Sequence, residues 1–118
     1  MKKIIVLLAV IIVTSCDSNT YEDIQADAPV EEVEITYDSH VKAIIEANCT
    51  NCHAPGGVAS FRPLTTYGEV VMAVESHDLI NRIQRQNGEP GLMPQTGRMP
   101  MDKIDRILEW AAEGLPEN

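Results

Sequence analysis

Cys49-Thr50-Asn51-Cys52-His53 is the stretch of this 118-residue chain from which its fold can be argued. In one turn of α-helix, residues at i, i+3 and i+4 lie on the same face. Cys49, Cys52 and His53 would therefore present two thiols and an imidazole side by side. Apolar residues recur at helical spacing just before the stretch, which places it at the end of a helix. The rest of the domain is expected to be organised around what this face binds.

The C-x-x-C-H pattern is typical of covalent c-type haem attachment. The two thiols would add to the vinyl groups at the porphyrin edge, and the imidazole of His53 would be the proximal iron ligand. A dithiol redox centre and half of a zinc site are the alternative interpretations. The sequence favours neither, because no second C-x-x-C or H-x-x-x-H follows and no βαβ alternation surrounds the pair. His40 and His77 are isolated and are expected at the surface.

The first residues have the features of a targeting sequence. Lys2 and Lys3 are basic, Ile4 to Val13 is apolar, and small residues lead to Cys16. An apolar run of this length is shorter than the roughly 20 residues of a membrane-spanning helix. The segment resembles the leader of bacterial lipoproteins, which implies removal of residues 1–15 and lipidation of Cys16. An ordinary signal peptide, with the cysteine uninvolved, and an uncleaved leader remain the alternatives.

The segment after Cys16 is acidic and contains no Lys or Arg up to residue 35. It lacks a sustained helical period, so residues 16–35 are predicted to be a flexible tether and residues 36–118 the folded domain. Val30, Val33 and Ile35 could add at most a short extended arm to that domain.

The chain has a formal net charge of −9. The leader holds two of the 9 basic residues and none of the 18 acidic ones, so its removal would leave a charge of −11. This excess of negative charge argues against nucleic-acid binding, which needs a basic patch. It suits docking on basic surfaces of redox partners, although acidity can also serve solubility alone.

Hydrophobic periodicity predicts short helices separated by long loops, with no strand alternation. The loop 54–63 is rich in Gly and Pro, so its backbone can pass close to a flat ring. The expected helices, with their apolar positions, are 38–48 (Val41, Ile44, Ile45), one capped by Thr66 (Val70, Val71, Val74), 78–86 (Leu79, Ile80, Ile83) and one from Pro100 or Met101 to Gly114 (Ile104, Ile107, Leu108, Ala111). The predicted fold class is all-α, with three to five short helices.

The composition of residues 36–116 independently indicates a cofactor. This part has one Phe, one Trp and two Tyr. A domain of about 80 residues buries a self-sufficient core only marginally. One covalent haem, a large apolar disc, would compensate for that deficit.

These features together resemble the small class I c-type cytochromes, as carried on bacterial lipoproteins. The resemblance covers residues 36–116 and rests on Cys49 to His53, on Leu64-Thr65-Thr66-Tyr67, on Met93-Pro94 and on a last helix with Trp110 and Gly114. It implies that the N-terminal helix crosses the C-terminal one, with Trp110 packing between them rather than relaying electrons. It also implies haem attachment outside the cytoplasmic membrane, in the cell envelope, facing the periplasm or the outer face of the membrane.

In that family a methionine from the loop before the last helix is the distal iron ligand. Met93 matches best, because Pro94 follows it and a loop separates it from the helix. Met99 is the alternative, although it lies where the family usually carries a buried aliphatic residue. Met101 is a weaker candidate, and Met72 is expected to fill the core.

The resemblance implies a one-electron carrier rather than an enzyme, with redox proteins as partners and a methionine ligand that favours reduced iron. A haem subunit of a larger oxidoreductase is the first alternative. An open-site haem sensor or peroxidase-like protein is the second. The candidates for pairing with the haem propionates are Arg62, Arg82, Arg85 and Arg98, among which the sequence does not choose.

Overall fold

The computed structural model describes residues 33–118. The expected leader, Cys16 and the acidic segment up to Glu32 lie outside this range. The described part is helical and contains no strand, which confirms the all-α prediction. Its elements are η1 (Tyr37–Val41), α1 (Lys42–Asn48), α2 (Thr50–His53), α3 (Tyr67–Ser76), α4 (Leu79–Gln84) and α5 (Met101–Ala112).

The predicted helix 38–48 forms, but it starts one residue earlier and begins with a wide turn. Thr36 is the N-cap, and its hydroxyl accepts a hydrogen bond from the backbone N–H of Ser39 at 3.4 Å. The first turn, η1, is π-helical and continues directly into α1. Both Tyr37 and Val41 are buried, so this turn packs its apolar side into the core.

Two end signals read from the sequence define α3 and α5. The backbone N–H of Thr66 donates to the Glu69 carboxylate at 3.0 Å, and the Glu69 N–H donates to the Thr66 hydroxyl at 3.3 Å, forming the predicted capping box. At the end of α5, Gly114 adopts a φ of +93°. Leu115 N–H then reaches back to the Trp110 carbonyl at 3.0 Å, which closes the helix.

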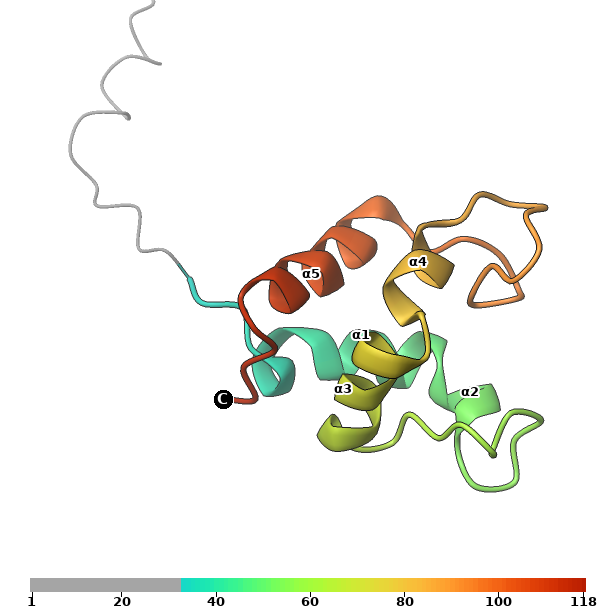
Figure 1. Ribbon diagram of the computed structural model, residues 1–118, viewed down its shortest axis with the longest axis horizontal. Coiled ribbons are helices and arrows are strands. Elements are labelled where there is room, and N and C mark those ends of the chain that lie inside the picture. Colours follow the sequence, from blue (N-terminus) through green and yellow to red (C-terminus); the bar gives the residue numbers. More distant parts are fainter. Residues whose placement is uncertain (1–32) are drawn as a thin grey trace, which may run out of the picture. The chain divides into compact units, whose positions relative to one another are not determined.

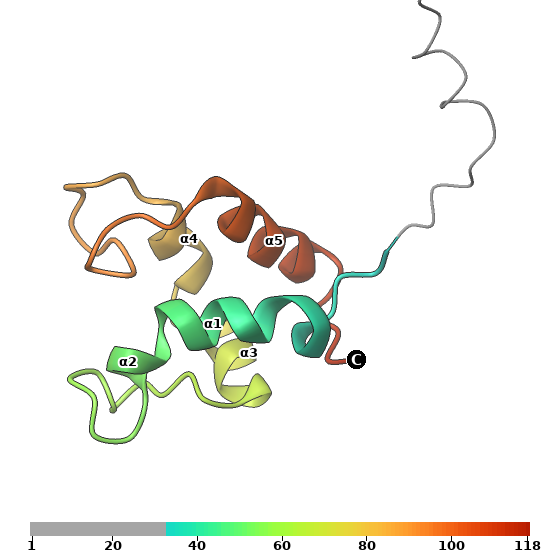
Figure 2. The same ribbon diagram turned by 180° about the vertical axis from the view of Figure 1, so that it is seen from behind.

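The core lies where α5 packs against the N-terminal helical segment, beside α3 and α4 (Figures 1 and 2). Trp110 is fully buried, and its ring centroid lies 5.8 Å from that of Tyr37 and 6.5 Å from that of Tyr67. The prediction that Trp110 packs the last helix on the first is thus confirmed. Other core residues come from every helix except α2, namely Val41, Ile45, Val70, Leu79, Ile83, Ile104 and Ile107.

The two ends of the described chain meet at one end of the domain (Figure 1). Tyr37 N–H donates to the Pro116 carbonyl at 2.9 Å, and Ile35 N–H donates to the Glu113 carboxylate at 2.8 Å. Ile35, which the sequence analysis places at the end of the tether, is buried in the core. The opposite end of the domain holds α2 and the loops 54–63 and 85–100. Within residues 33–118 no helix has the length and apolar character needed to cross a membrane.

Candidate functional site

Cys49, Cys52 and His53 occupy a single helical turn, as their spacing predicts. The N–H of Cys49 donates to Ile45 at 2.8 Å, which continues the hydrogen bonding of α1. The Cys49 carbonyl then accepts from the N–H groups of Cys52 at 3.2 Å and His53 at 3.0 Å. All three side chains line one cavity.

The imidazole of His53 is oriented by the loop that follows it. Its Nδ1 lies 2.7 Å from the backbone oxygen of Arg62. A carbonyl can only accept, so Nδ1 carries the proton and donates this bond. In this tautomer the free lone pair is on Nε2, as a histidine that binds a metal through Nε2 requires. The Leu64 N–H donates to the His53 carbonyl at 2.8 Å and holds the loop against the turn.

The two cysteines are free thiols, each partly buried. Burial raises the pKa of the Cys49 thiol to about 11. A reactive redox dithiol needs a lowered pKa, because the thiolate is the attacking species. The environment of Cys49 therefore does not activate this thiol as a nucleophile.

The cavity has a volume of about 900 Å³. This is near the upper end of the roughly 300–1,000 Å³ typical of cofactor sites. Five elements contribute to its wall: the α1–α2 turn, the loop 54–63, α3, α4 and the segment 93–96. Gly57 fits against the carbonyl of Cys52 so closely that an added Cβ would collide with it. The loop can therefore follow the cysteine turn only with glycine at this position.

Exposed apolar side chains surround this cavity. Val58 is 89% exposed, Phe61 79% and Met72 56%, and all three are on its lining. Exposed apolar groups gathered at one place mark a binding site more often than chance exposure does. Val58 and Phe61 were not predicted as site residues, and the only signal for them in the sequence is their position in a Gly- and Pro-rich loop beside the cysteine motif.

The structure separates the methionines. Met93 is partly buried and lies on the cavity lining, whereas Met99 is 4% exposed and belongs to the core. Met101 is half exposed at the start of α5. The expectation that Met72 fills the core is wrong: α3 turns this side chain outward onto the cavity wall, because Val70 and Ala73 occupy its buried face.

The two histidines expected at the surface are only partly exposed. The Nδ1 of His40 accepts a hydrogen bond from the N–H of Thr36 at 3.2 Å, so its role is to stabilise the first helical turn. His77 lies on the cavity lining at the end of α3.

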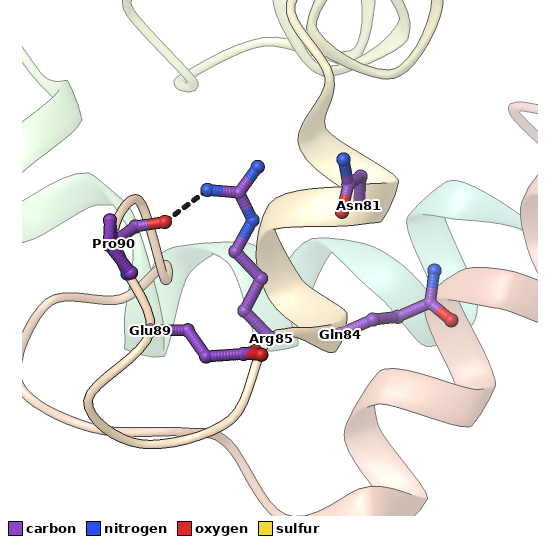
Figure 3. A pocket seen from close by; sticks show the side chains of 5 residues that line it. All are labelled: Asn81, Gln84, Arg85, Glu89 and Pro90. Carbon is purple, nitrogen blue, oxygen red and sulfur yellow. Dashed lines mark hydrogen bonds between the residues drawn. The ribbon is translucent and has the colours of Figure 1, made fainter.

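A smaller polar hollow of about 360 Å³ lies between α4 and the loop after it (Figure 3). The Arg85 guanidinium crosses it and donates to the Pro90 carbonyl. A second nitrogen of the same group lies 3.7 Å from the Asp78 carboxylate. These contacts occupy the Arg85 cation within the protein.

Among residues 33–118, no three His, Cys, Asp or Glu side chains gather closely enough to hold a metal ion. Comparisons with protein-family models, with curated proteins and with solved structures each found no match to this chain.

Proposed function

We propose that this protein is a monohaem c-type cytochrome, anchored to a bacterial envelope membrane through lipidated Cys16, that carries single electrons between redox proteins. The observation that carries the proposal is that one cavity is lined by Cys49, Cys52, His53 and Met93. Two thiols, an imidazole and a thioether are the set of groups that attach a haem c and bind its iron from both sides.

The cavity fits such a group by size and by chemistry. Its lining is mainly apolar, as the ring requires, and Val58, Phe61 and Met72 expose apolar surface that a bound ring would cover. Arg82 also places a positively charged side chain on the lining. We further propose that the helical domain has the class I cytochrome c architecture, with α1 and α5 as its crossing helices.

Each residue then has a defined role. Cys49 and Cys52 hold the porphyrin edge covalently, which prevents loss of the group during electron transfer. His53 presents Nε2 to the iron, because the Arg62 carbonyl holds the proton on Nδ1. Met93 would supply a thioether to the iron, and a thioether favours the reduced iron. The bound haem supplies reversible one-electron oxidation and reduction.

If His53 and Met93 both held the iron of the haem, that iron would have no free site for a substrate. This distinguishes a carrier from a haem sensor or a peroxidase-like protein. The exposed side chains Val58 and Phe61 border the cysteine turn, so the porphyrin edge there is the expected exit for electrons. The strongly acidic chain would meet basic partner surfaces with an association rate that falls as salt rises.

The test is to express the full chain together with a c-type haem maturation system. We expect a haem spectrum that survives denaturation and acid extraction, because thioether bonds do not dissociate. A variant with Cys49→Ser and Cys52→Ser should lose it. The ferrous wild-type protein should not bind carbon monoxide. Absence of covalent haem would refute the proposal, and carbon monoxide binding by the wild type would replace the carrier with an open-site haem protein.

A further inference from the structure

Met93 is carried by a segment that forms neither helix nor strand. Residues 85–100 connect the end of α4 to the start of α5, and Met93 lies near the middle of this loop. A side chain on a loop is held less precisely than one on a helix, unless contacts from other residues fix the loop. The position of Met93 on the cavity lining therefore depends on what holds residues 85–100 in place.

Asn87 joins the two flanks of this loop. Its side-chain oxygen, Oδ1, accepts a hydrogen bond from the backbone N–H of Arg98 at 2.8 Å. The two residues are 11 positions apart, and Met93 lies between them. Gly97 is also close, since a Cβ added there would lie 3.8 Å from the same oxygen. A bond that closes a loop in this way reduces the number of backbone conformations open to the residues between its ends.

A second group of contacts ties the first half of the loop to α4. The Arg85 guanidinium points to Pro90 and donates to its carbonyl, as Figure 3 shows. The same guanidinium lies 3.7 Å from the carboxylate of Asp78, the residue before α4. The Met93 N–H donates to the Arg82 carbonyl at 3.2 Å. The backbone up to Met93 is thus held at several points.

Residues 94–98, which follow Met93 directly, depend more on Asn87. Within the described part of the chain, two hydrogen bonds engage the backbone N–H groups of this stretch. One joins the Gly97 N–H to the Pro94 carbonyl at 3.2 Å and stays inside the stretch. The other is the bond from Arg98 to Asn87, which reaches the opposite flank. Loss of the Asn87 oxygen would therefore release the half of the loop that α4 does not hold.

We propose that Asn87 is a positioning residue for Met93: it keeps the loop closed and so holds the thioether at the iron of the bound haem. This inference rests on the proposed function. A ligand from solution can bind that iron only after the Met93 sulfur has dissociated; the lone pair of the new ligand replaces that of the sulfur, and no electron is gained or lost. The apparent affinity of such a ligand rises with the fraction of molecules in which the loop is open. Asn87 lowers this fraction.

The experiment is a titration of the ferric, haem-loaded full chain with imidazole, followed through loss of the weak sulfur-to-iron band. Asn87→Ala removes the acceptor of the Arg98 N–H. We expect its apparent affinity for imidazole to be about three- to tenfold higher than that of the wild type, which is the effect of one net hydrogen bond. Asn87→Asp keeps an oxygen at the same position and should have an affinity close to that of the wild type.

Gln84→Ala is the matched control. The Gln84 side chain is also an exposed amide, but it donates to the Ile80 carbonyl at 3.0 Å within α4 rather than across the loop. Gln84→Ala therefore loses an amide and one hydrogen bond, as Asn87→Ala does, and should bind imidazole as the wild type does. A residue that merely stabilised the domain would not separate these two variants.

The outcomes separate this inference from the function on which it rests. If the wild type carries no covalent haem, both are overturned. If haem is bound but the wild type lacks the sulfur-to-iron band, the roles of Met93 and Asn87 are overturned together. If the band is present and Asn87→Ala binds imidazole no more tightly than Gln84→Ala, only the role of Asn87 is overturned.

Asn87→Asp gives a further check on the acceptor. An affinity raised equally in Asn87→Ala and Asn87→Asp would refute the role of the Arg98 bond, because the aspartate keeps an oxygen that can accept it. Should Asn87→Ala fail to take up haem, Asn87→Asp decides alone: a wild-type affinity supports the proposal, and a raised affinity overturns it.

Discussion

Met93 and Met99 form a matched pair for testing the distal ligand, because each precedes a proline and each lies in the segment before α5. Met93 lies on the cavity lining, whereas Met99 is 4% exposed within the core. On the proposed function, we therefore expect Met93→Ala to remove a ligand of the haem iron. Met99→Ala should instead lower the free energy of unfolding. Removing the Met93 thioether should abolish the weak ferric sulfur-to-iron band, open the ferrous iron to carbon monoxide and lower the reduction potential.

The magnitude for Met99 follows from its burial. Truncation of a buried methionine to alanine costs about 2–5 kcal/mol, since the lost transfer free energy and the new cavity add together. In a domain of about 60–100 residues, 1 kcal/mol shifts Tm by about 4–8 °C, so Tm should fall by at least about 8 °C. Met99→Ala should keep the sulfur-to-iron band and exclude carbon monoxide.

The assay combines optical spectra, with and without carbon monoxide, and thermal unfolding followed in the far ultraviolet. Loss of the band in Met99→Ala but not in Met93→Ala would show that the ligand assignment is reversed. Retention of the sulfur-to-iron band in both variants would show that neither residue binds the iron. It would refute the assignment of the distal ligand from the residues on the cavity lining.

Three further predictions concern the domain itself. Trp110→Phe should remove the indole Nε1 donor of the 2.8 Å bond to the Pro116 carbonyl, which still accepts from the Tyr37 N–H. For the lost hydrogen bond we expect a decrease of about 0.5–1.5 kcal/mol in urea unfolding. Hydrogen bonds, first from the Thr65 backbone and then from its hydroxyl, lower the pKa of the Glu69 carboxyl from its ordinary value of 4.5. Because a lowered folded-state pKa contributes stability above the unfolded value, the advantage of wild type over Glu69→Gln should be complete at neutral pH and disappear as pH falls below 4.5, as measured by unfolding midpoints. Gly114→Ala should lower the free energy of unfolding by about 1–2 kcal/mol, because the left-handed backbone conformation disfavours a Cβ. If the control Ala112→Gly were equally destabilised, the effect would belong to the helix end in general and not to the conformation of Gly114.

Local hydrogen-bonding rules made much of the secondary structure predictable. The Thr66–Glu69 capping box and the stop at Gly114 depend on a few consecutive residues, and both form as expected. The apolar periodicity identified Ile45 of α1 and Ile104 and Ile107 of α5 as buried. The other expected positions, Ile44, Leu108 and Ala111, are only partly buried. The wide first turn was not predicted, since the pattern of apolar residues is the same for an α-helical and a π-helical start.

Of the candidate site, only the helical turn that carries the two cysteines and the histidine could be predicted from the sequence. Cys49, Cys52 and His53 fall together because three or four residues complete one helical turn. The opposite wall is built from α3, α4 and the segment 93–96, and no local rule states which of their side chains face the cysteines. Met72 illustrates this limit: its apolar character predicted the core, yet the orientation of α3 places it on the cavity.

The helical character of the domain and the placing of Cys49, Cys52 and His53 on one helical turn follow from the sequence, because both depend on contacts within one or two turns. Only the packing of distant segments places Met93 rather than Met99 on the cavity lining, and it buries a nitrogen of Arg82 that has no hydrogen-bond partner within residues 33–118. These facts depend on how distant segments pack around one another. The position of a side chain in such a cavity is set by the whole core rather than by its neighbours in the chain.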